Sequence, residues 1–372
     1  MKAVFADLAE SAGRDDLLPK LKTADLPQER KEPQIEKIRQ LSMVPDEPIR
    51  LMDSGFLGRF YAPESLMLFV NTEGLGRDAL DTLDLELSSF ETVRHELDEA
   101  TFIFLKYRLR SLYKPKSEYR SQGSASDLVS LADDSGRYKG HEIGDLIKAH
   151  DEISVYSISD DSILRDCSAW HIASYLACSL PEFRPRNFPQ ELAVAFRDLL
   201  QLRNANPELI YYALTSLHWR QCYLETYKLL ESLFYLPWVH RLQRDHGFSA
   251  DGLTIARQLK QAVGWRRKES ESIEALFELA GAEATKWDRL KFTSAFSDFN
   301  FEEASVSAFA RRIYKIRNLL VHQEDFEDAA PIKCDNADWP ILIEYVVHIA
   351  HQLYRDFYGD TDFSSFYKIR GS

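Results

Sequence analysis

The sequence has 372 residues, enough for two or three domains, and its 45% hydrophobic and 28% charged residues are typical of a folded globular chain. The net charge of −13 opposes non-specific binding to nucleic acid, so any RNA contact requires a local basic patch. The cysteines lack Cys-x-x-Cys spacing, which argues against a zinc or disulfide framework, and with no signal-like start or long apolar run we expect a cytoplasmic protein without membrane contact.

Prolines and charged residues dominate residues 1–50, which we expect to be extended or poorly ordered apart from a short helix around Gln34–Leu41.

Residues 51–190 are predicted to form a mixed α/β or irregular module of unknown role. The apolar runs Ser65–Val70 and Ile153–Ile158 predict buried strands. Ser88 and Glu91 fit a capping box ahead of a helix over Thr92–Tyr113. The following residues 115–140 are expected to be a loop, Ser168–Leu180 a further helix, and the prolines 181, 185 and 189 mark the predicted domain boundary.

Residues 191–372 show the apolar spacing of helices, so we expect a mainly α chain whose C-terminal domain is a helical bundle. The predicted helices cover Pro189–Arg203, Pro207–Leu236, Leu253–Val263, Glu271–Glu283, Phe301–Val321 and Pro340–Phe357.

Arg317 interrupts the apolar stripe of the helix over Phe301–Val321. At about 100° per residue it falls within about 40° of Ile313 and about 60° of Leu320. A guanidinium on such a face needs an acidic partner, a ligand or a protein interface. His322 follows about 140° further round and about 7.5 Å along an unbroken helix, so the two side chains should converge only if the helix bends or ends, or if two subunits meet there.

The run Arg317-Asn318-Leu319-Leu320-Val321-His322 resembles the Arg-x4–6-His motif of the HEPN superfamily, including the polar residue after the arginine. The stretch Tyr223–Phe234 is similar to that family's earlier aromatic helix, with Glu231 at the acidic position and Glu225 as a second choice. The resemblance covers residues 196–360. It implies an all-helical bundle, usually a homodimer joined through the motif helix, whose active members are metal-independent RNA endonucleases.

On this resemblance Arg317, His322, Asn318 and Glu231 are the expected catalytic residues. A histidine can exchange protons near neutral pH, and an arginine can stabilise a phosphate as charge builds on it. RNA supplies its own 2′-hydroxyl nucleophile, so the expected product is a 2′,3′-cyclic phosphate, with no cofactor. The family analogy further suggests a toxin or anti-phage role, with an inhibitory or sensor partner.

Three other interpretations remain open at this stage. Arg317 could pair structurally with a buried acid such as Glu231 while His322 caps the helix end. The same fold could be a non-catalytic module that binds nucleic acid, a nucleotide or a protein. It could also be a scaffold whose Arg317 pairs across a dimer seam.

Basic residues offer candidate RNA contacts in two places. Lys106, Arg110 and Lys114 alternate with tyrosines that could stack on bases, although a solvated helix face explains them as well. Arg312 and Lys315 lie on the motif helix, mainly off its apolar stripe. Glu344, His348 and His351 share the last helix, but too few further ligands accompany them for a metal site, so we expect packing and no metal there.

Overall fold

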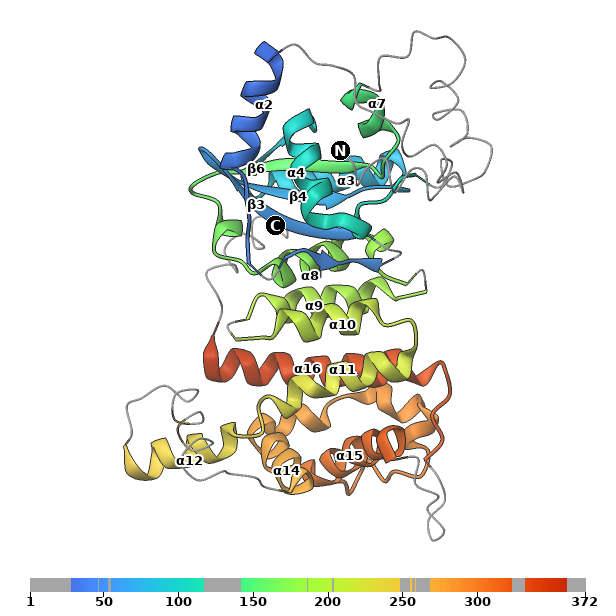
Figure 1. Cartoon of the computed structure of the whole chain (residues 1–372). Helices are drawn as coiled ribbons and strands as arrows, with labels where there is room; N and C mark the ends of the chain where they lie inside the picture. Colours follow the sequence, from blue (N-terminus) through green and yellow to red (C-terminus); the bar gives the residue numbers. More distant parts are fainter. Residues whose placement is uncertain are drawn as a thin grey trace. The chain divides into compact units, whose positions relative to one another are not determined.

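The computed structural model describes residues 28–45, 47–52, 55–116, 142–185, 187–202, 204–247, 268–322 and 332–359, with the single positions 255 and 258. Its contacts divide the chain into two compact units, Met1–Ala173 and Ser174–Ser372. Figure 1 shows a sheet with helices in the first unit and helices in the second, so the chain is mainly helical with an N-terminal antiparallel sheet. No helix in the described part of the chain is long and apolar enough to span a membrane.

The sheet of the first unit is antiparallel, with strand order β1-β3-β4-β6-β5 and β2 paired to β3. Its centre is β3 (Phe56–Ala62), β4 (Ser65–Asn71) and β6 (Ile153–Ile158), flanked by β1 (Ser42–Met43), β2 (Ile49–Arg50) and β5 (Thr92–His95). Gly58 on β3 pairs with Phe69 on β4, and a Cβ at Gly58 would lie 2.7 Å from the Phe69 ring. The two strands predicted from apolar runs are therefore confirmed at the centre of the sheet.

Helices α2 (Gln28–Gln40), α3 (Arg77–Ser88), α4 (Glu99–Leu109) and α7 (Ile143–Lys148) accompany this sheet, with the short turns η3 (Arg110–Leu112) and η4 (Ile163–Arg165). The core is aromatic, and Phe56, Phe69, Phe102 and Tyr113 are almost fully buried in it. Apolar burial of this kind is the main stabilising term of such a unit.

The predicted helix over Thr92–Tyr113 is wrong at its start. Residues 92–95 form the edge strand β5, and α4 begins only after Asp98, whose carboxylate accepts the backbone N–H groups of Ala100 and Thr101. Asp98 is thus the N-cap of α4, while Ser88 ends α3 and Glu91 has a positive φ of 57° in the turn that follows. The capping-box pattern identified a helix end instead of a helix start.

The second unit consists of helices connected by short turns. The main helices are α9 (Gln190–Leu200), α10 (Pro207–Thr215), α11 (Trp219–Glu231), α12 (Leu236–His246), α14 (Glu269–Ala280), α15 (Val306–His322) and α16 (Asp338–Tyr358), preceded by α8 (Ala169–Ser179), which crosses the division between the units. The short turns are η5 (Pro181–Phe183), η6 (Gly281–Thr285), η7 (Asp288–Phe292) and η8 (Ser294–Phe296). Helix α16 packs on α9, α11 and α14, and its apolar face is buried.

The predicted long helix over Pro207–Leu236 is instead two helices followed by the start of a third. Helix α10 ends at Thr215, where the hydroxyls of Thr215 and Ser216 donate to the carbonyls of Tyr211 and Tyr212 and the backbone of Ser216 becomes extended. Pro237 lies in the first turn of α12, where its missing N–H costs nothing. Of the predicted helix Leu253–Val263, all but positions 255 and 258 lies outside the described residues.

Candidate active site around Arg317

Helix α15 presents Arg317 beside two other helices. The apolar positions Phe309, Ala310, Ile313 and Ile316 are buried, and α15 contacts α11 and α14. The buried hydroxyl of Tyr223 on α11 donates to the Ile313 carbonyl at 3.0 Å, one turn before Arg317. The packing that the apolar stripe predicts therefore brings Arg317 against α11 and α14.

The Arg317 guanidinium is mostly buried, with 15% of its side chain exposed, and it binds two carboxylates. Its Nη2 donates to Glu231 Oε1 at 3.2 Å, and its Nη1 lies 3.3 Å from Glu269 Oε2. Nη1 also donates to Asn318 Oδ1 at 3.1 Å, and the guanidinium carbon lies 5.8 Å from the centre of the Tyr227 ring. Of the three partners expected for an arginine on this stripe, namely an acid, a ligand or a protein interface, the structure shows the acid.

The two carboxylates give this site one negative charge more than Arg317 can neutralise. Burial raises the pKa of Glu231 above its usual value and the nearby Glu269 adds to this, while Arg317 opposes it. Burial also raises the pKa of Tyr227, so its ring faces Arg317 as a neutral phenol. A phosphate reaching Arg317 would therefore meet two acids as well as the guanidinium.

His322 is the last residue of α15, and its side chain lies outside the described part of the structure. The helix continues unbroken to this residue, so the backbone positions of residues 317 and 322 lie about 140° apart around the axis and about 7.5 Å along it. The bend that would bring the two positions together within one helix is absent between them.

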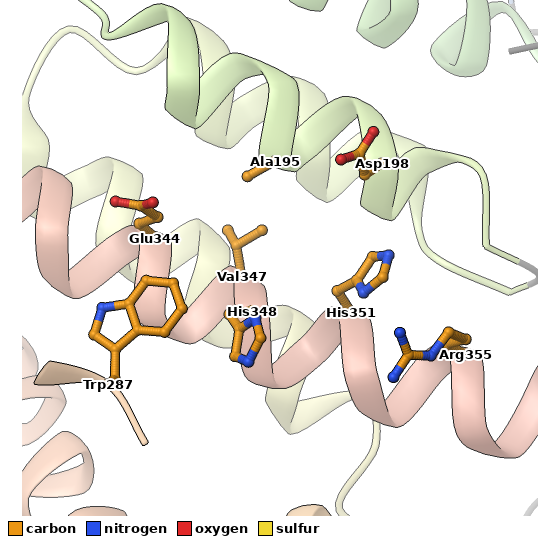
Figure 2. A pocket seen from close by; sticks show the side chains of 8 residues that line it. All are labelled: Ala195, Asp198, Trp287, Glu344, Val347, His348, His351 and Arg355. Carbon is orange, nitrogen blue, oxygen red and sulfur yellow. The ribbon is translucent and has the colours of Figure 1, made fainter. Parts of the chain in front are cut away.

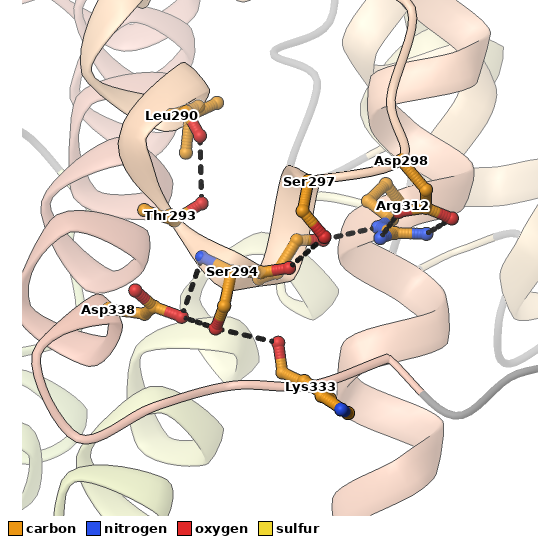
Figure 3. A network of polar contacts seen from close by, with 9 residues as sticks. Leu290, Thr293, Ser294, Ser297, Asp298, Arg312, Lys333 and Asp338 are labelled. Carbon is orange, nitrogen blue, oxygen red and sulfur yellow. Dashed lines mark hydrogen bonds and ion pairs between the residues drawn. The ribbon is translucent and has the colours of Figure 1, made fainter.

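The predicted RNA contacts have mixed outcomes. Lys106 is 2% exposed, and its ammonium donates to the backbone carbonyl of Tyr113, so it closes the end of α4 and is inaccessible to RNA. Arg312 is similarly committed within the chain, because it donates to the Ala295 carbonyl and forms an ion pair with Asp298 (Figure 3). Arg110, Lys114 and Lys315 are exposed, and whether they contact RNA stays a prediction.

A network beside the motif helix fixes the turn that precedes it (Figure 3). Asp338, buried in the first turn of α16, accepts the backbone N–H groups of Ser294 and Asp335 at 3.0 Å and also the Ser294 hydroxyl. Arg312 of α15 donates to the carbonyl of Ala295, the middle residue of η8. Turn η8 is therefore attached to both α15 and α16.

Glu269 and the pairing of Tyr227 with Arg317 were not predicted. Tyr227 belongs to the aromatic helix that we aligned with Glu231, one turn before it, and that spacing is a usable sequence signal. Glu269 begins α14, and no local pattern connects it to a residue 48 positions later (317 − 269 = 48). In the described part of the chain, no group of three or more His, Cys, Asp or Glu side chains could hold a metal ion.

Comparison with known proteins adds no relative: no family model, no curated protein and no solved structure matches the chain.

Proposed function

We propose that the second unit is a HEPN-like metal-independent RNA endonuclease whose catalytic pair is Arg317 and His322. The observation that supports it best is the Arg317 environment: a guanidinium on the apolar side of the motif helix, oriented by Glu231 and Asn318, yet with 15% of its side chain still exposed. A guanidinium that is held in one direction and keeps part of its surface open can contact a phosphate.

The proposed reaction uses atoms of the RNA itself. The 2′-oxygen attacks the adjacent phosphorus, the bond to the 5′-oxygen breaks, and a proton passes from the former to the latter. His322 would accept or deliver that proton, and Arg317 would stabilise the charge on the non-bridging oxygens. The products are a 2′,3′-cyclic phosphate and a free 5′-hydroxyl.

A site composed of two subunits follows from the helical geometry. The backbone positions of residues 317 and 322 lie about 140° apart around one continuous helix, so we propose that a single copy does not bring both residues to one phosphate. Two motif helices packed about a twofold axis could place Arg317 of one copy near His322 of the other. We therefore propose a homodimer through α15, with RNA bound across the seam.

Substitution at Arg317 tests the proposal directly. Arg317→Ala should reduce cleavage of a labelled RNA by about 10²–10³-fold, the usual effect of removing one transition-state donor. Arg311→Ala is the matched control, because Arg311 lies on the same helix, is 55% exposed and pairs with Glu274. Cleavage by Arg317→Ala at the rate of Arg311→Ala would refute the catalytic role.

The ion pair between Arg317 and Glu231 also favours a second candidate, a non-catalytic helical module in which the pair is purely structural. In that case the purified protein cleaves no RNA, and Arg317→Ala lowers the melting temperature without changing any activity.

A further inference from the structure

A pocket of about 280 Å³ lies between α9 and α16, on helices other than those that hold Arg317 (Figure 2). One face of α16 forms its long wall, Ala195 and Asp198 of α9 face that wall, and Trp287 lies at one end. Small-molecule sites commonly measure about 300–1,000 Å³, so this pocket lies just below that range and suits a small ligand.

Each end of the pocket carries a carboxylate. Glu344 lies at the Trp287 end, while Asp198 lies at the other end, across from His351 (Figure 2). His351 follows Glu344 by seven positions (351 − 344 = 7), which correspond to about 10 Å along α16. The two acids are thus separated by roughly the length of a short extended molecule.

Asp198 makes no hydrogen bond or ion pair through its carboxylate with any described residue. Although it reaches solvent at the mouth of the pocket, the packing around it raises the pKa of its carboxyl, opposed by Arg197 and His351. Glu344 is 21% exposed and pairs with Arg289 through Oε2. A cation in the pocket would supply a partner to Asp198 and a second one to Glu344.

The middle of the pocket is neutral and largely apolar. Val347 is 1% exposed and faces Ala195 from the opposite wall. The Trp287 indole packs against the His348 imidazole with ring centres 4.8 Å apart and the ring planes tilted by 38°. Burial lowers the pKa of His348, so this ring is uncharged at neutral pH and does not repel a cation.

Two other ligand classes fit less well. A metal ion would require a group of three or more His, Cys, Asp or Glu ligands, and the described residues contain none. An anion would be repelled by the carboxylates of Asp198 and Glu344. One arginine, Arg355, is among the residues that line the pocket, and it already pairs with Asp356.

We propose that this pocket binds an aliphatic diamine or polyamine, with one ammonium at Asp198, another at Glu344 and the methylene chain over Ala195 and Val347. The Trp287 ring adds a π face to the ammonium at the Glu344 end. A lysine side chain of a partner would offer the same alkylammonium but only one charge, so the two separated acids favour the free diamine.

Isothermal titration calorimetry of the full chain at physiological salt tests this, with putrescine, spermidine and the monoamine n-butylamine as probes. We expect saturable one-to-one binding of a diamine, and binding of n-butylamine weaker by about tenfold because one charged contact is lost. Asp198→Asn and Glu344→Gln should each weaken diamine binding by about tenfold. Binding of n-butylamine, which has a single ammonium, should be weakened by one of these two substitutions and not by the other.

Asp288→Asn is the matched control for the overall negative charge. Asp288 adjoins Trp287 in sequence, is 82% exposed, pairs with Lys291 and does not line the pocket. Its variant should bind as the wild type does. Absence of saturable binding, equal affinity for n-butylamine and putrescine, or equal loss in Asp288→Asn and Asp198→Asn would each overturn the proposal. Circular dichroism melting curves verify that the variants are folded. If one of the two acid variants does not fold, the other still allows the comparison with Asp288→Asn.

Discussion

At Arg317, one of the two bound carboxylates is easier to displace than the other. Glu269 is 44% exposed, whereas Glu231 is 31% exposed and lies on the same helix as Tyr227, which packs below the guanidinium. Because Glu269 is the more exposed of the two acids, its ion pair with Arg317 is the weaker one, and Glu269 can yield to a phosphate at the smaller cost. We therefore expect Glu269 to compete with RNA, and Glu231 to keep Arg317 in place.

Removing that competition should strengthen RNA binding. Glu269→Gln is expected to bind a non-cleavable 2′-O-methyl oligonucleotide about two- to fivefold more tightly, the factor that a surface ion pair of up to about 1 kcal/mol represents. Fluorescence anisotropy measures the change. Glu271→Gln removes the same charge from an exposed position of the same helix turn and should have a smaller effect. Unchanged or weaker binding by Glu269→Gln would show that Glu269 does not compete with RNA for Arg317.

Glu231 should give stability a characteristic pH dependence. Burial raises its pKa in the folded state, so the folded chain holds this proton more tightly than the unfolded chain does. The resulting stabilisation is fully present below the unfolded pKa and is lost as pH rises through the folded one. Glu231→Gln mimics the protonated form. The loss in free energy of unfolding that this substitution causes, measured with urea, should therefore be smaller at about pH 7 than at about pH 4. A larger cost at the higher pH would mean that the ion pair with Arg317 outweighs burial.

Among the elements, α15 depends on the turn η8 for its position against α16. Asp338 accepts three hydrogen bonds that connect the start of α16 to Ser294 and Asp335, and Arg312 attaches the same turn to α15 (Figure 3). Loss of Asp338 would leave the half-buried backbone N–H of Ser294 without this acceptor. By contrast, the Ser294 hydroxyl also donates to the Lys333 carbonyl, and the Asp335 N–H also donates to the Ser294 hydroxyl.

Asp338→Ala should therefore lower the free energy of unfolding by about 1–3 kcal/mol, the usual cost of removing a charged acceptor from a donor that is partly buried. Urea unfolding followed by circular dichroism gives the value. The control is Asp356→Ala in the last turn of the same helix, which is 45% exposed and should change stability by less than about 0.5 kcal/mol. Equal effects of the two substitutions would mean that the network does not hold η8.

The spacing of apolar residues predicted helices and strands well where burial leaves a single pattern. It predicted the first and last residues of these elements less well. Strand Ile153–Ile158 was predicted at its observed bounds because a central strand is buried on both faces and its sequence is mostly apolar. The edge strand β5 was missed, because Val93 is 61% exposed and the same residues also fit a helical spacing. The break after Thr215 was missed because it depends on side-chain hydrogen bonds to carbonyls, which no apolar pattern records.

The candidate site divides in the same way. The apolar stripe of α15 predicted that Arg317 lies on a packed face and needs an acid, a ligand or an interface. The aromatic helix predicted Glu231 as the acid. The second acid, Glu269, comes from a separate helix, so only tertiary packing brings it to Arg317. Burial of Lys106 could not be read from its basic, alternating surroundings, because a lysine that closes a helix end has the same local sequence as a solvated one.

For the whole molecule, the proposal requires more than one copy. If Arg317 and His322 act on one phosphate as proposed, their positions on one continuous helix require a second copy to complete the site. We expect light scattering coupled to size-exclusion chromatography to give twice the mass of one chain. Activity should then fall with dilution below the dimer dissociation constant. A fully active monomer would contradict the composite site.

The most direct measurement is the chemistry of the ends that the protein leaves on RNA. Total RNA is incubated with the purified chain and a metal chelator, beside the His322→Ala variant, and the fragment ends are mapped. We predict cleavage that persists in the chelator, yields 2′,3′-cyclic phosphates with free 5′-hydroxyls, and disappears in His322→Ala. Intact RNA with the wild type, or the same fragments with His322→Ala, would contradict the proposed function.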